Sequence, residues 1–218
     1  MNQNNKIAFV IPSLQAGGME RVMSELANYA STKTDVKSIL ISLSNTREFY
    51  EISSEVEYYK PDFNFNSKHR FFSTIKLMLF LRRKLRSLKP EAVLSFGETY
   101  NSFVLLSAIG LGLRIFVSDR SRPDKNWGFF HNHLRKILYP LAKGVISQTL
   151  FSKEFLTKET GHTNICVIPN PVDINKFKTS NKENIILTVG RLIGTKRIDL
   201  LLNLFANINN DNWQLWIV

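Results

Sequence analysis

Cysteines and metal-binding patterns are nearly absent from the sequence. Cys166 is the only cysteine in the 218 residues, so no intrachain disulfide can form and a reducing compartment is compatible with the chain. The four histidines are scattered and no Asp-x-Asp sequence occurs, so we expect no metal site and no cofactor. The N-terminal MNQNNK leads into an apolar run without signal-peptide features, which predicts a cytoplasmic protein.

Long apolar runs are also missing. The apolar part of the stretch 69–89, FFSTIKLMLFL, is shorter than the ~20 residues that a transmembrane helix needs. This stretch lacks acid as well, since no Asp or Glu lies between Asp62 and Glu91. Its second half keeps one leucine stripe and places Arg82, Arg83 and Arg86 on the remaining surface. That pattern favours a helix on an anionic membrane surface; the simpler alternative is a solvated helix face.

Acidic residues are outnumbered along the whole chain. The formal net charge is +11 and the pI is about 9.8, which predicts an anionic partner. Nucleic acid, an acidic membrane surface and a phosphorylated substrate all satisfy this charge. Nucleic acid is the weakest of the three, because the basic residues sit beside an apolar seam and no recognised DNA- or RNA-binding motif accompanies them. We expect no nucleic-acid partner.

The N-terminal stretch changes from one structural period to another. Ile7–Ile11 is an unbroken apolar run, Pro12 ends it, and apolar residues then recur at helical spacing as far as Ala30. Gly17 and Gly18 lie between the two patterns, so we expect a strand, a glycine loop and a helix. Such a junction attracts anions in open α/β sheets, which indicates a phosphate-bearing ligand. The alternative is that the glycines only permit a tight turn.

The following segments alternate in the same way. We expect strands over 36–43, 55–59, 92–96, 113–117, 145–148 and 165–168, and helices over 69–89, 100–109, 133–141 and 151–159. Alternation with short connections predicts an α/β fold with a doubly wound parallel sheet, Rossmann-like. The loops that follow the carboxyl ends of these strands should open toward the same crevice as the glycine loop.

A boundary is expected where the sequence reads PNPVD, from Pro169 to Asp173, because two prolines exclude both a helix and a central strand. The pattern then restarts with a strand over 184–189, a loop over 190–197, a helix over 198–208 and a strand over 213–218. One βαβ unit cannot enclose a core. We therefore predict a complete domain over 1–175, then a hinge and the incomplete start of a second Rossmann-like domain over 176–218.

Three motifs in order, AGGMERV, VIPNPVDINKF and TVGRLIGTKRIDLLL, resemble the retaining glycosyltransferases of family 4, which have the two-domain GT-B fold. Within that family, SDRSRPD followed by LRKILYPLAKGVISQT is similar to bacterial N-acetylgalactosaminyltransferases that act on undecaprenyl-diphosphate-linked glycans. The resemblance implies an acceptor-side domain followed by the beginning of a donor-binding domain. A Glu-x7-Glu segment that such enzymes use to hold the donor sugar is absent, so the chain resembles a C-terminally truncated member.

The resemblance implies that Arg191 and Lys196 bind the diphosphate of the nucleotide sugar. Together with the glycine loop, this gives the expected donor-binding residues Gly17, Gly18, Arg191 and Lys196. The basic helix and the loop after the fifth strand give the expected acceptor-binding residues Arg82, Arg83, Arg86 and Arg120. Many relatives carry a histidine in the loop after the fourth strand, where this chain has Gly97-Glu98-Thr99. No residue is assigned as the catalytic one.

The function implied is the transfer of a hexose or N-acetylhexosamine from a UDP- or GDP-sugar to a lipid-linked or polysaccharide acceptor, with retention, in bacterial surface glycan assembly. The protein would be peripheral, at the inner face of the cell membrane. The alternative is a catalytically inactive fragment that acts at most as a basic module binding lipid or polyanions. We expect that residues 1–218 alone do not turn over.

Overall fold

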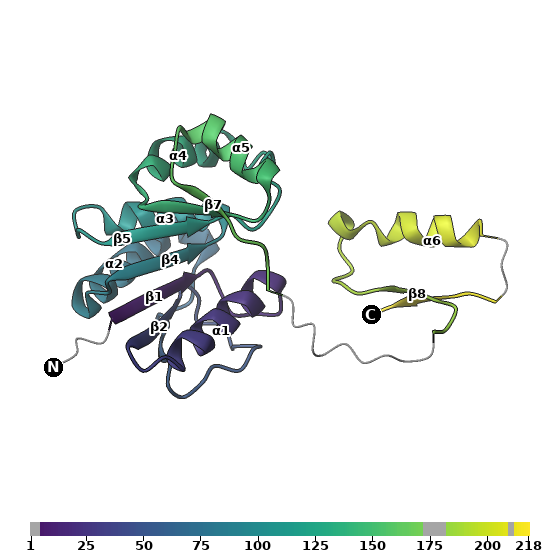
Figure 1. The fold of residues 1–218 in the computed structure, drawn as a ribbon, viewed down its shortest axis with the longest axis horizontal. Helices are drawn as coiled ribbons and strands as arrows, with labels where there is room; N and C mark the ends of the chain where they lie inside the picture. The colour runs from purple at the N-terminus through teal and green to yellow at the C-terminus, as the bar shows by residue number, and fades with distance from the viewer. Residues whose placement is uncertain (1–4, 172–181, 209–211) are drawn as a thin grey trace. The chain divides into compact units, whose positions relative to one another are not determined.

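The computed structural model describes residues 5–171, 182–208 and 212–218 (Figure 1). The chain divides into two compact units, Met1–Pro171 and Val172–Val218. Each unit has a β-sheet of its own, and the described strands of both sheets are parallel. The predicted α/β class with a Rossmann-like parallel sheet is therefore confirmed.

Unit 1 is built on a sheet of seven described strands in the order β3-β2-β1-β4-β5-β6-β7. From β1 the chain first adds β2 and β3 on one side and then β4 to β7 on the other side. The strand order therefore reverses between β1 and β4, which makes the sheet doubly wound. The strands are β1 (Asn5–Ile11), β2 (Val36–Ser42), β3 (Glu57–Tyr59), β4 (Ala92–Phe96), β5 (Arg114–Ser118), β6 (Gly144–Ser147) and β7 (Ile165–Val167). The central strands read as apolar runs because helices cover both of their faces.

Successive residues of the strands point to opposite faces and form two separate cores. Phe9 and Ile11 of β1 pack with the helix α1 (Gly18–Ser31), whereas Ala8 and Val10 pack in the cluster that holds the other helices of this unit. Those helices are α2 (Arg70–Leu88), α3 (Glu98–Ala108), α4 (Phe129–Leu138) and α5 (Leu150–Thr160), with the short 3₁₀ turns η1 (Ser67–His69) and η2 (Tyr139–Leu141).

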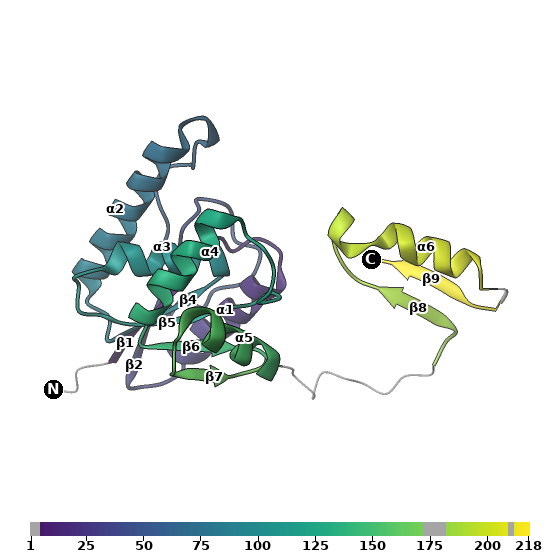
Figure 2. The ribbon, with the colours of Figure 1, turned by 90° about the horizontal axis from the view of Figure 1, so that it is seen from above.

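The direction of the strands places the helix N-termini. Each helix leads from the carboxyl end of one strand to the amino end of the next parallel strand, so the N-termini of α1 to α5 lie at the carboxyl edge of the sheet. In Figure 2 the end of α2 that joins η1 extends beyond the other helices of the unit. The expected common edge of loops is thus present, and a long helix stands beside it.

Unit 2 contains the parallel strands β8 (Ile185–Thr188) and β9 (Gln214–Ile217), the turn η4 (Gly194–Lys196) and the helix α6 (Ile198–Ala206). None of its described residues is buried. Large apolar side chains of β8 and α6 are exposed, among them Leu187, Leu200 and Leu204. The described residues of unit 2 therefore enclose no core.

Two helices begin earlier than the sequence pattern indicated. α3 starts at Glu98 instead of residue 100, and α4 starts at Phe129 instead of residue 133. The buried residues of α4 are Arg135 and Leu138. Its first turn therefore has no buried apolar residue that the spacing of the sequence could reveal. The glycine that precedes each helix, at a positive φ of 101° for Gly97 and 92° for Gly128, is the local signal that marks the start.

The packing of α2 gives a test of the fold. Leu81 is fully buried in the core of unit 1, whereas Leu79 on the same helix is 45% exposed. We expect Leu81→Ala to lower the free energy of unfolding of unit 1 by about 2–5 kcal/mol. Leu79→Ala should change it by less than about 0.5 kcal/mol. Urea denaturation followed by circular dichroism measures both, and equal losses would contradict the placement of α2.

Candidate functional site

The glycine loop between β1 and α1 is held by a tyrosine from a distant loop. The hydroxyl of Tyr50 donates to the carbonyl oxygen of Gly17 at 2.8 Å and accepts from its backbone N–H at 3.2 Å. A Cβ on Gly17 would collide with the carboxylate of Glu20, whereas a Cβ on Gly18 would meet no atom of the described residues within 4 Å. Gly18 therefore borders open space at the N-terminus of α1.

The junction of β4 and α3 lies against this first loop. Gly97 adopts a positive φ of 101°, and a Cβ there would lie 3.6 Å from both Pro12 and Met19 of the β1–α1 connection. A side chain at this position would meet only ordinary van der Waals contacts but would need an unfavourable backbone conformation. The two junctions therefore form one continuous surface at the carboxyl edge.

Glu98, directly after that glycine, fixes the loop that follows β5. Its side chain is buried, and Oε1 accepts from the backbone N–H groups of Arg120 at 2.7 Å and Ser121 at 2.5 Å. A carboxylate bonded by two backbone N–H groups holds its loop in one conformation. Glu98 lies in the loop where, by the family resemblance, a histidine would be expected. In this chain it instead fixes the loop that carries Arg120.

A buried network lies beneath this loop. The amide nitrogen of Asn101 donates to Oδ1 of Asp119 and to the hydroxyl of Tyr139, each at 3.1 Å, and its oxygen accepts from Ser95 at 2.8 Å. The Tyr139 hydroxyl also donates to Oδ1 of Asp119 at 2.5 Å. Oδ2 of Asp119 is buried and has no hydrogen-bond partner among the described residues. The network joins β4, α3, β5 and η2.

Burial decides the titration of this network. Burial, and after it the nearby Glu98 carboxylate, raise the pKa of Asp119 from an ordinary 3.8 to about 7, although the hydrogen bond from Tyr139 opposes the shift. Burial and the same Asp119 carboxylate raise the pKa of Tyr139 well above its ordinary value. The tyrosine hydroxyl therefore stays protonated and donates, while Asp119 changes its charge near neutral pH.

Arg120 reaches across the top of the site. Its guanidinium lies 4.2 Å from the ring centroid of Phe96 and donates to Oδ1 of Asn170 at 2.5 Å. Burial lowers the pKa of Arg120 and the Glu98 carboxylate raises it, but an arginine remains charged at neutral pH. A fixed, half-buried cation is thus present at the carboxyl edge, where the sequence analysis placed an acceptor-binding residue.

The arginines of α2 differ in their surroundings. Arg82 donates to the carbonyl oxygens of Ser107 at 3.0 Å and Ile109 at 2.7 Å, so it caps the C-terminus of α3. Arg83 and Arg86 are exposed. Arg83 borders a groove of about 470 Å³ together with Asp62, Phe63, Lys76, Leu79, Phe80, Lys84 and Ser87. This groove places three cations beside apolar side chains.

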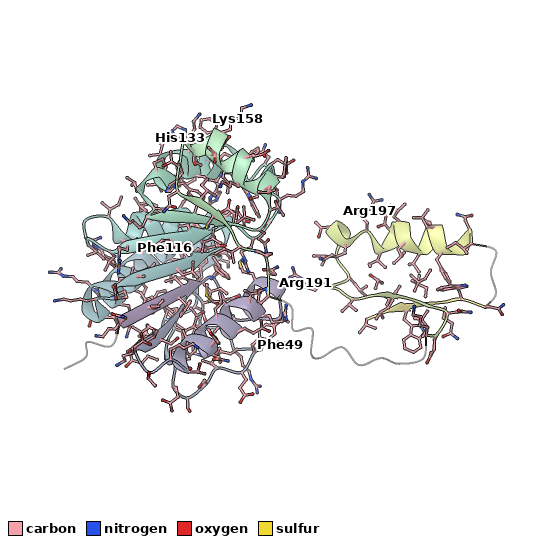
Figure 3. The ribbon with its side chains drawn as sticks, viewed as in Figure 1. Phe49, Phe116, His133, Lys158, Arg191 and Arg197 are labelled. Atoms are coloured by element: carbon pink, nitrogen blue, oxygen red, sulfur yellow. The ribbon has the colours of Figure 1, made fainter. Side chains whose placement is uncertain are left out.

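Arg191 and Lys196 lie in the loop between β8 and α6. Both are exposed, and Figure 3 shows Arg191 and Arg197 at the two ends of this loop. The side chain of Lys196 passes 3.9 Å from the place that a Cβ on Gly190 would take. Arg197 is paired with Asp199 at 3.2 Å. The loop therefore presents Arg191 and Lys196 after the carboxyl end of a parallel strand.

The predicted site residues fall in three places. Gly17, Gly18 and Arg120 lie along the carboxyl edge of unit 1, the arginines of α2 lie on a helix of the same unit, and the remaining pair lies in unit 2. Four residues that organise the edge were not predicted from the sequence: Tyr50, Asn101, Asp119 and Tyr139. Only Asp119 had a signal there, because it lies in the loop that follows the predicted strand 113–117.

Residues 5–171, 182–208 and 212–218 contain no group of three or more His, Cys, Asp or Glu side chains placed to hold a metal ion. In the same residues no helix combines the length and the apolar character that crossing a membrane requires.

Comparison with known proteins gives consistent matches. The sequence profile described as Glycosyltransferase Family 4 matches residues 16–176. A Campylobacter jejuni protein described as GalNAc-alpha-(1->4)-GalNAc-alpha-(1->3)-diNAcBac-PP-undecaprenol alpha-1,4-N-acetyl-D-galactosaminyltransferase is 26% identical over 94% of this chain. The amylovoran biosynthesis glycosyltransferase AmsD of Erwinia amylovora is 28% identical over 93%. The chain spans 58% of the length of each of these relatives.

Solved structures support the fold. Alr3699/HepE of Anabaena in complex with UDP superposes with a TM-score of 0.68, at 14% identity, over 97% of this chain and 60% of that protein. At this identity the similarity shows the architecture alone.

The raised pKa of Asp119 gives a second test. Since the folded pKa exceeds the unfolded one, the folded state binds the proton more tightly, and stability falls as pH rises from about 4 to about 7. We expect the stability of the wild type relative to Asp119→Asn to fall by about 1.4 kcal/mol per pH unit in that window. Urea denaturation at several pH values measures the difference. A difference independent of pH would show that Asp119 is not held as described.

Proposed function

Because this chain belongs to glycosyltransferase family 4, we propose that it forms part of a retaining enzyme that transfers a hexose or N-acetylhexosamine from a nucleoside diphosphate sugar. The acceptor is a glycan carried on a lipid diphosphate, in the assembly of bacterial surface glycans. The groove along α2 carries the acceptor part of this proposal, because it combines cations with apolar side chains. The chain spans 58% of the length of each of the two curated relatives.

We propose donor contacts in each unit separately: at the glycine loop of unit 1, and at the β8–α6 loop of unit 2 that carries Arg191 and Lys196. Departure of a nucleoside diphosphate leaves negative charge on the phosphates, and fixed cations at that position lower the barrier. Arg191 offers a planar fork to two phosphate oxygens, and Lys196 offers a point charge. The open space beside Gly18 allows a ligand to approach the backbone at the N-terminus of α1.

The acceptor is assigned to α2. Its groove brings Lys76, Arg83 and Lys84 together with Phe63, Leu79 and Phe80. Lys76 and Lys84 each lie with Nζ 4.0 Å from an aromatic ring centroid, of Phe63 and Tyr59, so these cations sit directly beside apolar surface. A polyprenyl diphosphate has this same combination of a charged head and an apolar chain. The name of the Campylobacter relative describes action on such a glycan lipid.

A second function has an observation of its own. None of the described residues of unit 2 is buried, whereas unit 1 has two complete cores. Unit 1 can therefore bind lipid or polyanions in the absence of transfer. Affinity for a nucleotide sugar distinguishes the two functions, because the enzyme binds the donor and a lipid-binding module does not. The two following tests examine donor binding and acceptor binding separately.

The donor assignment predicts the effect of a valine at Gly18. Because the protein itself has room for this side chain, Gly18→Val should leave the circular dichroism unchanged but occupy the space of the ligand. We expect the affinity for UDP-N-acetylgalactosamine or a GDP-sugar to fall more than about tenfold. Isothermal titration calorimetry measures it, with Glu25→Val on the exposed side of α1 as control. Equal affinities of Gly18→Val and the control would refute the assignment.

The acceptor assignment predicts the effect of removing charge from α2. We expect Arg83→Gln with Arg86→Gln to weaken binding to vesicles that contain undecaprenyl diphosphate by roughly thirtyfold, at about 1 kcal/mol per charge and low salt. Lys33→Gln with Lys37→Gln removes the same charge at the amino edge of the sheet and should have little effect. If both pairs weaken binding equally, net charge explains the affinity and the groove does not.

Arg82 is tested separately, because its guanidinium caps α3. Arg82→Gln should lower the stability of unit 1 by about 1.5–3 kcal/mol, the range for hydrogen bonds to charged groups. Vesicle binding by folded Arg82→Gln protein at low temperature then reports any additional role in acceptor binding.

A further inference from the structure

The segment Lys125–His133, here called the α4 tip, has a fixed conformation. Oδ1 of Asn126 accepts from the backbone N–H of Gly128 at 2.8 Å and from the amide of Asn132 at 2.9 Å. The backbone N–H of Asn132 in turn donates to the carbonyl oxygen of Gly128 at 3.1 Å. Gly128 takes a positive φ of 92° directly before the helix. The turn therefore holds the residues after Gly128 in a defined direction.

This turn directs large apolar side chains into solvent. Phe129 is 87% exposed and Phe130 is 67% exposed. The ring of Phe129 stacks on that of His133, with centroids 5.8 Å apart, and Lys125 lies with Nζ 3.8 Å from the ring centroid of Trp127. Figure 3 shows His133 on the outer side of α4, away from the sheet. An ordered aromatic cluster of this kind is expected to have a partner.

The charge around the α4 tip identifies the class of partner. No Asp or Glu occurs between Asp124 and Glu154, and Asp124 is itself paired with Arg122 at 2.5 Å. The exposed cations of this interval at the start of α4 and of α5 are Lys125 and Lys153, and Lys136 lies further along α4. Aromatic side chains beside unpaired cations fit a surface that is apolar inside and negatively charged outside.

The position of the α4 tip indicates a flat partner. α2 also begins with two exposed phenylalanines, Phe71 and Phe72, and α5 begins with exposed Leu150 and Phe151. The helices α2 and α4 both pack on α3, so the two phenylalanine pairs lie at the N-termini of helices that cover the same face of the sheet. All three pairs stand at helix N-termini on one edge and one face of the sheet. Three separate pairs of exposed apolar side chains along one edge suit a flat partner better than a narrow one.

We propose that the α4 tip inserts Phe129 and Phe130 into the interface of an anionic lipid bilayer, as a contact additional to that of α2. This inference rests on the proposed function for the idea that the acceptor is a membrane lipid. The two contacts together orient the carboxyl edge of unit 1, with Arg120 and the glycine loop, toward the headgroups. The α4 tip binds the bilayer and does not bind the diphosphate.

Cosedimentation with vesicles of phosphatidylethanolamine and phosphatidylglycerol, without any polyprenyl lipid, tests the contact. We expect Phe129→Ser with Phe130→Ser to reduce partitioning at least about tenfold. Tyr29→Ser, at a 62% exposed aromatic on α1, should leave it unchanged. The contact is refuted if the double variant partitions like the wild type, or if Tyr29→Ser loses as much. Because these vesicles contain no acceptor lipid, a failure of the acceptor proposal leaves this result unaffected.

A spectroscopic readout locates the contact. Trp127 is one of three tryptophans, and replacing Trp213 and Trp216 by phenylalanine leaves it as the only one. On binding vesicles with brominated acyl chains, its fluorescence should be quenched, and Phe129→Ser with Phe130→Ser should abolish the quenching. Vesicle-bound protein with unquenched Trp127 would overturn the proposal. A dimer in solution that the phenylalanine variants dissociate, without any change in vesicle binding, would also overturn it in favour of self-association.

Discussion

The buried amide of Asn101 is the interaction on which the carboxyl edge of unit 1 depends. It joins Ser95 at the end of β4, Asp119 after β5 and Tyr139 in η2, all within hydrogen-bond distance and away from solvent. An unsatisfied buried polar group costs about 1–3 kcal/mol, so each member requires the others. Glu98 adds the backbone of Arg120 and Ser121 to this network. The loop that carries Arg120 is thereby a fixed part of the fold.

The fold class followed from local patterns, because apolar runs such as Ile7–Ile11 fill a parallel sheet that is covered on both faces. The network did not follow, since Asn101 and Tyr139 are 38 residues apart and no local pattern pairs them. The start of α4 was not predicted because Phe129 and Phe130 face solvent. Exposed residues do not follow the helical spacing by which buried apolar residues reveal a helix. The hydrogen bonds of Arg82 to the end of α3 could not be predicted from the sequence either. Arg82 therefore differs in its surroundings from Arg83 and Arg86, although the sequence pattern treats the three arginines alike.

Unit 1 presents its functional groups in two layers. The carboxyl edge carries the open space at Gly18 and the cation of Arg120, which suit the polar reactants of a transfer reaction. The helices α2 and α4 carry cations and exposed aromatic side chains beside that edge, which suit a lipid and its membrane. A glycosyltransferase of family 4 with a lipid-linked acceptor needs both at once, because the sugar must be transferred where the headgroup meets water.

We propose that the groove along α2 binds the diphosphate and the first part of the polyprenyl chain. Photo-crosslinking with a polyprenyl diphosphate that carries a benzophenone near its head, followed by peptide mapping, measures this binding. We expect labels on peptides that contain Phe63, Leu79 or Phe80, and their loss when unlabelled undecaprenyl diphosphate competes. Labels confined to α1, or labels that the competitor does not reduce, would contradict it.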